Sequence, residues 1–152
     1  MITIQSTKDN DIITSIITEP QLWDLEYGQG MGLKDFQVDW SYRYLLIKDN
    51  EEILGLFQVR DFTRIVLEAH IYLLPKYWGN TYSKDSIKAL IKYLTDMTHY
   101  HSLITDVPVV CKHVINLLKK IGARQSGFIN NGVIYNNKLT DLMLFSYQIK
   151  RG

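Results

Sequence analysis

The segment LLPKYWGNTYSKD, residues 73–85, joins two stretches with different hydrophobic periods, and this change of period most limits the fold. Before it, the run TRIVLEAHIYLLP is apolar and of strand type. After it, apolar residues recur at helical spacing and predict an amphipathic helix from about Ser83 to Tyr100. A strand, a short turn and a long helix in this order indicate a mixed α and β fold.

The rest of the chain continues this mixed pattern. Two apolar runs around the polar turn KDNEE predict an antiparallel hairpin. The N-terminal part predicts a strand, ITIQ, and two helices, the first capped by Asp9 or Asp11 and the second starting at Pro20. The C-terminal part predicts a strand, a helix ended by Gly122, and two further strands. The expected order is therefore one strand, two helices, three strands, a helix, a strand, a helix and two strands.

Composition limits the number of domains and the possible partners. A chain of 152 residues with 46% hydrophobic residues can bury one sizeable core, so we expect a single domain over residues 1–152. Lys and Arg total 17 against 16 Asp and Glu, which gives no reason to expect nucleic-acid binding. No apolar stretch approaches the ~18 residues of a membrane span, no secretion signal is visible, and Cys111 is the single cysteine. We expect a cytoplasmic protein with no membrane partner.

Three stretches of the sequence resemble the Gcn5-related N-acetyltransferase (GNAT) superfamily. In LLPKYWGNTYS a strand ends at Pro75 before a turn and a long helix, as in the family's Q/R-x-x-G-x-G/A turn. CKHVINLLKKIGA keeps Lys120 and Gly122 in register with a second family pattern, and GVIYNNKLTDLMLFS is similar to the family's closing hairpin, with Asp141 after the turn. Small phage-encoded members resemble the chain most. The resemblance implies a central, mostly antiparallel sheet of about seven strands, splayed between the fourth and fifth, with about four helices.

The resemblance also implies acetyl-CoA as a substrate, with its pyrophosphate at the start of the long helix. Backbone N–H groups at a helix N-terminus and the helix dipole bind diphosphates. Trp78 stands where the family has Gln or Arg, Thr81 stands where it has glycine, and Ser83 is a candidate helix cap. The expected CoA-binding residues are Leu73, Leu74, Trp78, Gly79, Asn80, Thr81, Tyr82, Ser83, Lys84 and Cys111.

Glu68 and His70 are the expected catalytic residues. The resemblance implies a general base at Glu68, and His70 lies two residues further on the same face of a strand. Such a pair can take a proton from an amine near neutral pH. The alternative for both residues is a solvated polar face, or pairing with Arg60 or Arg64.

Two further roles follow from the resemblance. A backbone N–H near Leu73 or Leu74 is expected to polarise the thioester carbonyl. The family's tyrosine acid is replaced by Leu118, and Tyr72 or Tyr100 is a candidate substitute.

The acceptor amine is expected between the second helix and the final hairpin. The expected lining residues are Trp23, Tyr27, Phe36 and Tyr72. The leading hypothesis is an enzyme that transfers an acetyl group from acetyl-CoA to an unknown amine by direct attack in a ternary complex, without a metal. The alternative is a protein that keeps the fold without the chemistry and serves as an interaction or assembly module, for example in a phage particle, with a protein partner or as a homodimer.

Overall fold

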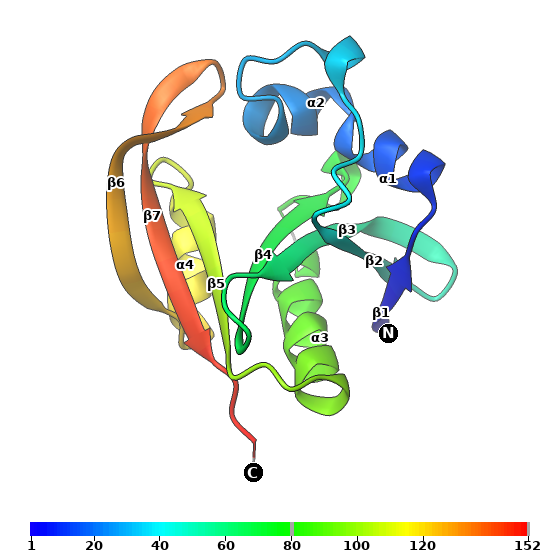
Figure 1. The fold of residues 1–152 in the computed structure, drawn as a ribbon, viewed down its shortest axis with the longest axis vertical. Coiled ribbons are helices and arrows are strands. Elements are labelled where there is room, and N and C mark those ends of the chain that lie inside the picture. The colour runs from blue at the N-terminus through cyan, green and yellow to red at the C-terminus, as the bar shows by residue number, and fades with distance from the viewer. Residues whose placement is uncertain (80, 152) are drawn as a thin grey trace.

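The computed structural model describes residues 1–79 and 81–151. Within these residues a seven-stranded sheet has the order β1-β2-β3-β4-β5-β7-β6, with helices on both faces (Figure 1). The strands are β1 (Ile2–Thr7), β2 (Arg43–Asp49), β3 (Glu52–Asp61), β4 (Val66–Leu73), β5 (Ser102–Pro108), β6 (Arg124–Tyr135) and β7 (Lys138–Gln148). The α-helices are α1 (Asn10–Ile17), α2 (Pro20–Leu22), α3 (Tyr82–Met97) and α4 (Lys112–Lys120). The fold class and element order expected from the sequence are confirmed.

The sheet divides between β4 and β5. All other neighbouring strands pair antiparallel, whereas β4 and β5 run parallel and pair only at Val66–Ser102, Leu67–Leu103 and Glu68–Ile104. Beyond Glu68 the two strands diverge, and Figure 1 shows β1–β4 on one side of the resulting notch and β5–β7 on the other. The splay expected between the fourth and fifth strands is confirmed.

The N-terminal helices begin at side-chain caps. The Asp9 carboxylate accepts hydrogen bonds from the amides of Asp11 and Ile12, at 3.0 and 3.2 Å. Glu19 caps α2 in the same way, and Pro20 occupies its first position. After α2 the chain continues as one turn of π-helix, η1 (Trp23–Tyr27), and a loop then leads to a short 3₁₀-helix, η2 (Leu33–Asp35).

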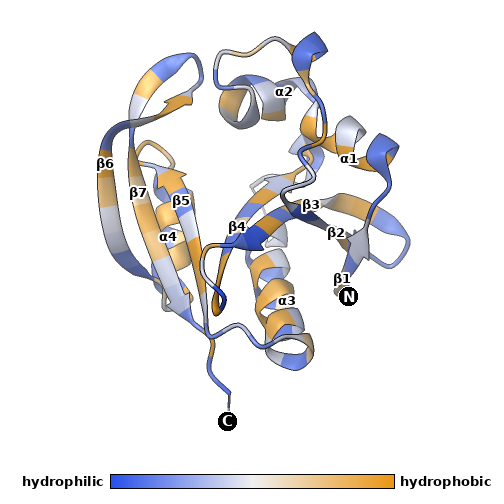
Figure 2. Ribbon diagram, viewed as in Figure 1, coloured by the Kyte–Doolittle hydropathy of each residue, from blue (hydrophilic) through white to orange (hydrophobic). Residues whose placement is uncertain are grey.

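Helix α3 is shorter than the sequence predicts. It ends at Met97 rather than near Tyr100, because Thr98 already has extended backbone with ψ of 174°. Thr81 precedes the helix and Ser83 is its second residue, so the expected hydroxyl cap from Ser83 is wrong. Ser86, Leu90 and Leu94 are buried at helical spacing, and Figure 2 shows hydrophobic and hydrophilic residues on different sides of this helix.

The helices pack as two layers. Leu67, Ala69 and Leu103 pack with α3, while Val107 and Phe145 pack with α4, so α3 and α4 cover the same face of the sheet. Helices α1 and α2 cover the opposite face of β2, β3 and β4, where the packed residues include Tyr44, Leu46, Leu56 and Tyr72. Between these layers the notch connects one face of the sheet to the other.

The hairpin of β6 and β7 reaches over the open end of the notch. Its turn is Asn136–Asn137, with φ of 51° and 62°, a left-handed conformation that asparagine tolerates. The Asn136 amide donates to the Leu25 carbonyl at 3.0 Å. The hairpin thus joins the C-terminal half of the sheet to η1 above the notch.

Candidate active site

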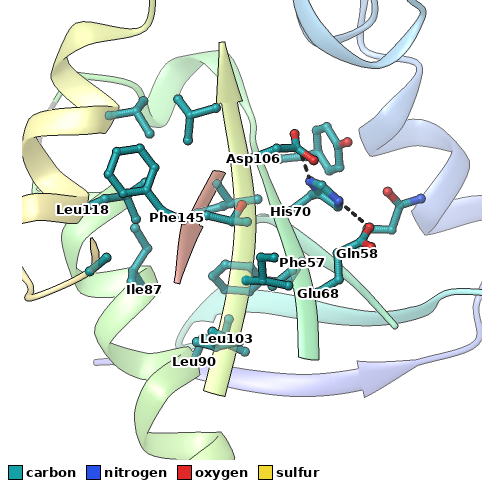
Figure 3. Close-up of a pocket in the computed structure, with 18 of the residues that line it drawn as sticks. Phe57, Gln58, Glu68, His70, Ile87, Leu90, Leu103, Asp106, Leu118 and Phe145 are labelled. Carbon is teal, nitrogen blue, oxygen red and sulfur yellow. Dashed lines mark hydrogen bonds and ion pairs between the residues drawn. The ribbon is translucent and has the colours of Figure 1, made fainter. Parts of the chain in front are cut away.

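A cavity of about 550 Å³ passes through the notch and is lined from both faces of the sheet (Figure 3). On the α1–α2 side its lining is polar and aromatic, and includes Tyr27, Gln58, Glu68, His70, Tyr72 and Asp106. On the α3–α4 side the lining is mainly apolar, and includes Ile87, Leu90, Cys111, Val114 and Leu118. The cavity therefore offers a ligand a polar end on one face of the sheet and an apolar end on the other.

Glu68 and His70 lie together on β4 at the point where β5 leaves it. The His70 Nε2 atom is 2.8 Å from the Glu68 Oε2 atom, and each side chain is only 16% exposed. The Arg60 Nε atom lies 3.3 Å from the other Glu68 oxygen. The hydrogen bond from His70 lowers the pKa of Glu68, and the charges of His70 and Arg60 lower it further, so this carboxylate is held ionised.

This pairing determines which nitrogen of His70 faces the cavity as an acceptor. An ionised carboxylate accepts hydrogen bonds only, so Nε2 of His70 is assigned as its donor. In the neutral ring, Nδ1 then carries the lone pair. The pairing of Glu68 with Arg60, which the sequence left open as an alternative, is also present. One Glu68 oxygen contacts His70 and the other contacts Arg60.

Asp106 lies across the notch from His70. Continuing the β4–β5 register by two residues from Glu68 and Ile104 places Asp106 level with His70, and its Oδ1 atom is 3.9 Å from His70 Nδ1. Burial raises the pKa of Asp106, and the charge of Glu68 adds to the rise while His70 opposes it. The Asp106 side chain is 38% exposed, and the residue lines the cavity.

A buried amide supports the polar face next to these groups. Gln58 is the cross-strand neighbour of His70 and is 4% exposed, and its Nε2 atom donates to the Tyr44 hydroxyl at 3.3 Å. Burial raises the pKa of the nearby Tyr27 phenol, which keeps its O–H protonated near neutral pH. At this end of the cavity the Gln58 amide is therefore held by a hydrogen bond, and Tyr27 presents a protonated hydroxyl.

The four expected acceptor-binding aromatics form one cluster. Tyr27 contacts Trp23, Phe36 and Tyr72, with ring centroids 5.6, 5.5 and 5.7 Å apart. Tyr27 and Tyr72 line the cavity, while Trp23 and Phe36 pack behind them, and the Trp23 indole donates to the Met31 carbonyl at 2.9 Å. The cluster fixes the position of the two tyrosines.

The opposite end of the cavity is an apolar slot between α3 and α4. Ile87 and Leu90 line it from α3, and Cys111 and Leu118 line it from α4. Cys111 immediately precedes α4 and is buried, and Leu118 is 7% exposed. Nothing on the Leu118 side chain can donate a proton there.

The expected phosphate-binding segment lies between the cavity-lining residues Tyr72 and Ile87. Asp85 donates its amide to the Thr81 carbonyl at 2.9 Å, so the preceding amides from Tyr82 to Lys84 are those that a helix start leaves without an intrahelical acceptor. Gly79 has φ of 80°, and Asn80 lies outside the described residues.

Two backbone groups before this segment already have partners. The Trp78 indole donates to the Leu73 carbonyl at 2.8 Å. The Leu74 amide donates to the Leu54 carbonyl at 2.9 Å. The amide of Leu74 is therefore engaged within the sheet.

The two candidate substitutes for the family's tyrosine acid lie in different places. Tyr72 lines the cavity. The Tyr100 hydroxyl instead accepts from Arg43 at 2.6 Å and donates to Asp61. Tyr100 belongs to a separate polar cluster of Arg43, Asp61 and Tyr100.

Asp106 and Gln58 are two polar cavity residues that the sequence did not lead us to expect. Asp106 is a single acidic residue inside the apolar run SLITDVPV, and Gln58 is a single amide inside ILGLFQV. A lone polar residue within an apolar strand is a usable signal, because a buried polar group needs a partner.

Within residues 1–79 and 81–151, no group of three or more His, Cys, Asp or Glu side chains is arranged to hold a metal ion. Over the same residues, no helix has the length and apolar character needed to span a membrane.

Solved structures share this architecture over almost the whole chain. A spermidine N-acetyltransferase from Vibrio cholerae, solved in complex with CoA and spermine, superposes with a TM-score of 0.80 at 14% identity, covering 97% of this chain and 95% of that one. The ribosomal-protein-S18-alanine N-acetyltransferase from Escherichia coli superposes with a TM-score of 0.74 at 15% identity, covering 100% of this chain and 96% of that one. No curated protein matches the sequence.

The splayed sheet and its helix layers therefore define a protein with the GNAT fold, as the sequence resemblance implied. At these identities the similarity establishes the fold, and the activity has to be argued from the site. The chain belongs to the family described as "Protein of unknown function (DUF2824)", which it matches over residues 26–152.

Proposed function

We propose that this protein is an acetyl-CoA-dependent N-acyltransferase that transfers an acetyl group to an amine by direct attack in a ternary complex. The observation that carries the proposal is the cavity through the notch, with the Glu68–His70 pair at the crossing between its polar end and its apolar slot. The solved spermidine N-acetyltransferase with the same fold was captured with CoA and a polyamine, which supports a CoA thioester and an amine as the two ligand classes.

The residues present fit such a thioester at two places. The slot formed by Ile87, Leu90, Cys111 and Leu118 suits an apolar arm. The amides from Tyr82 to Lys84, with the dipole of a 16-residue helix and the Lys84 cation, suit a pyrophosphate. When bound, acetyl-CoA supplies the acyl carbonyl that the amine attacks.

The chain's own contribution is positioning and proton transfer. Glu68 stays ionised, holds His70 by Nε2 and stabilises the imidazolium that forms when Nδ1 accepts a proton. The fixed face of Tyr27, Gln58 and Tyr72 places the acceptor next to that nitrogen. In this proposal Glu68 is a positioning carboxylate, since both of its oxygens are engaged, and His70 is the base.

Thermal unfolding with and without acetyl-CoA tests the proposal first. A ligand at 100 times its dissociation constant stabilises by about 2.7 kcal/mol, which raises the midpoint by roughly 5 to 10 °C in a domain of this size. We expect acetyl-CoA and desulfo-CoA to raise the midpoint more than ATP does. Release of CoA thiol in the presence of an amine panel then measures transfer.

His70→Gln is the variant that separates chemistry from binding. We expect it to keep the CoA-induced midpoint shift and to lose most of the amine-dependent thiol release, because general-base catalysis contributes on the order of 100-fold or more. No midpoint shift with any CoA compound would overturn the proposal.

A second function is favoured by two observations in the same region. The Trp78 indole occupies the Leu73 carbonyl beside the expected pyrophosphate site, and Leu118 replaces the family's proton donor. These departures suit an interaction or assembly protein that keeps the fold without turnover, for example in a phage particle. Absence of a CoA-specific shift, together with stable association with one protein partner, would favour this function.

A further inference from the structure

Asp106 lines the cavity opposite His70, and the mechanism proposed for Glu68 and His70 gives it no role. It projects from β5 on the face that also carries Glu68 and His70, opposite the apolar slot (Figure 3). Glu68 already has Arg60 and His70 as partners, at 3.3 and 2.8 Å. His70 is the basic residue that faces Asp106, with a gap of 3.9 Å between its Nδ1 atom and the Asp106 Oδ1 atom.

The two atoms that face one another across this gap are both acceptors. Nε2 of His70 is the donor to Glu68, so Nδ1 of the neutral ring carries a lone pair. The ionised Asp106 carboxylate also accepts only, and 3.9 Å is too long for a hydrogen bond between them. Two acceptors at this separation are satisfied together by one group that has several N–H donors and a positive charge.

We propose that Asp106 and Nδ1 of His70 together receive the ammonium group of the acceptor, with Asp106 binding its charge and His70 taking its proton. The inference deepens the proposed function and rests on it. It assigns Asp106, which the sequence reasoning passed over, as a substrate-binding residue.

The geometry accommodates such a group without movement of the strands. Charge-assisted hydrogen bonds are about 2.8 Å long, and an ammonium nitrogen at that distance from each acceptor spans a gap of 3.9 Å. One N–H then points to Asp106 Oδ1 and a second to His70 Nδ1. Of the two remaining directions of the tetrahedral nitrogen, one carries the third N–H and the other carries the alkyl chain, on the side of the sheet where Tyr27 and Tyr72 line the cavity.

In the proposed step one proton moves from the ammonium group to His70. The N–H bond directed at His70 breaks, its electron pair stays on the amine nitrogen, and the proton forms the Nδ1–H bond of an imidazolium. The alkylammonium becomes a neutral amine, and the new positive charge lies between the carboxylates of Glu68 and Asp106. The same two carboxylates thus stabilise the charge before and after the transfer.

The inference also limits the class of acceptor. A protonated alkylamine supplies both the charge and the N–H donors, whereas a quaternary ammonium supplies only the charge. An amine that is neutral near neutral pH supplies donors without charge. We therefore expect protonated alkylamines to bind best.

Nuclear magnetic resonance of the protein with isotope-labelled histidine tests the inference without needing turnover. The His70 signals are assigned by their loss in His70→Gln, and butylammonium chloride is the probe. We expect a saturable shift of the His70 Nδ1 signal near neutral pH. In Asp106→Asn we expect binding to weaken by about tenfold or more, because a hydrogen bond to a charged group is lost.

Two controls make the outcome decisive. Tetramethylammonium chloride has the charge without an N–H donor and is expected to give no Nδ1 shift. Asp24→Asn removes an exposed carboxylate outside the cavity lining and is expected to bind butylammonium as the unmodified protein does. Equal binding by Asp106→Asn, an equal response to tetramethylammonium, or no saturable shift in the unmodified protein each overturns the inference. Because the measurement uses no CoA, its failure is distinct from a failure to bind acetyl-CoA.

Discussion

At the scale of single residues, Asp106 has an environment that favours its protonated form. Burial raises its pKa above the ordinary value of 3.8. Between the ordinary and the raised pKa the folded protein binds more protons at this site than the unfolded chain, so stability falls as the pH rises through that range. We expect Asp106→Asn to raise the thermal midpoint near neutral pH and to leave it unchanged in acid, below the ordinary pKa.

The pKa of Glu68, on the neighbouring strand β4, is shifted in the opposite direction. The hydrogen bond from His70 lowers its pKa, so Glu68 contributes stability that is present above the ordinary carboxyl pKa and is lost as the pH falls through the lowered value. We expect Glu68→Gln to lower the midpoint near neutral pH, with the difference vanishing in acid. Thermal unfolding over a pH series measures both variants, with Asp24→Asn as the exposed control. Midpoint shifts of the same sign for Asp106→Asn and Glu68→Gln near neutral pH would contradict these environments.

The positions of Glu68, His70 and Asp106 along the chain explain why the sequence predicts the first two as site residues and not the third. Glu68 and His70 are two residues apart on one strand, and the period of a strand places them on the same face. Asp106 meets them only through the parallel pairing of β4 with β5, across a crossover that includes α3. No local pattern encodes that register, so the third member of the group was not predicted.

At the scale of elements, α3 depends on a residue from the other end of the chain. Its last turn has no basic residue of its own. Arg151 supplies the positive charge and donates to the carbonyls of Thr98 at 2.8 Å, Leu94 at 3.1 Å and Tyr100. The guanidinium therefore ties the last turn of α3 to the segment that follows it and complements the helix dipole.

We expect Arg151→Ala to lower the free energy of unfolding by about 1–2 kcal/mol, measured by urea denaturation, because several charge-assisted hydrogen bonds to the end of α3 are lost. Arg151→Lys is expected to recover only part of this, since an ammonium cannot reproduce the planar fork of donors. Lys150→Ala removes a neighbouring exposed charge and should change stability by less than about 0.5 kcal/mol. Equal stability of Arg151→Ala and Lys150→Ala would contradict the role of Arg151.

The elements themselves followed from the sequence, whereas their ends depended on contacts. The apolar runs gave the strands, and the spacing of Leu90 and Leu94 gave α3. The sequence predicts an end of α3 that is too late, because the aromatic ring of Tyr100 falls at helical spacing. In the structure the Tyr100 hydroxyl instead bonds Arg43 and Asp61, beyond the end of the helix. Tertiary contacts of this kind override local periodicity.

At the scale of the whole molecule, the notch joins two halves of the sheet through three residue pairs of β4 and β5. Elsewhere in the sheet, neighbouring strands pair along most of their length, as β1 does with β2 over six pairs. The hydrophobic pattern alone predicts seven strands but does not predict where the sheet divides. The resemblance to the GNAT superfamily predicts the division between the fourth and fifth strands. A site that crosses a sheet requires a separation of this kind, since continuous pairing would close it.

A ligand that fills this notch should stabilise segments of both halves together, and amide hydrogen exchange can measure this. With acetyl-CoA we expect slower exchange in residues 69–74 of β4 and its end, in residues 105–108 of β5, and in residues 81–85 at the start of α3. The reason is that these segments line or border the cavity and its expected pyrophosphate site, and binding raises the free energy of local opening.

The pattern of protection then separates the possible ligand sites. ATP, which offers phosphates without the long arm, should slow exchange only in residues 81–85, and neither ligand should affect β1, which lies at the far edge of the sheet. Protection by acetyl-CoA at the start of α3 without protection of β4 and β5 would mean that phosphates bind while the notch stays empty of the arm. That outcome would leave the Glu68–His70 pair without an acyl group to act on, because the pair lies at the crossing of the notch rather than at the helix start.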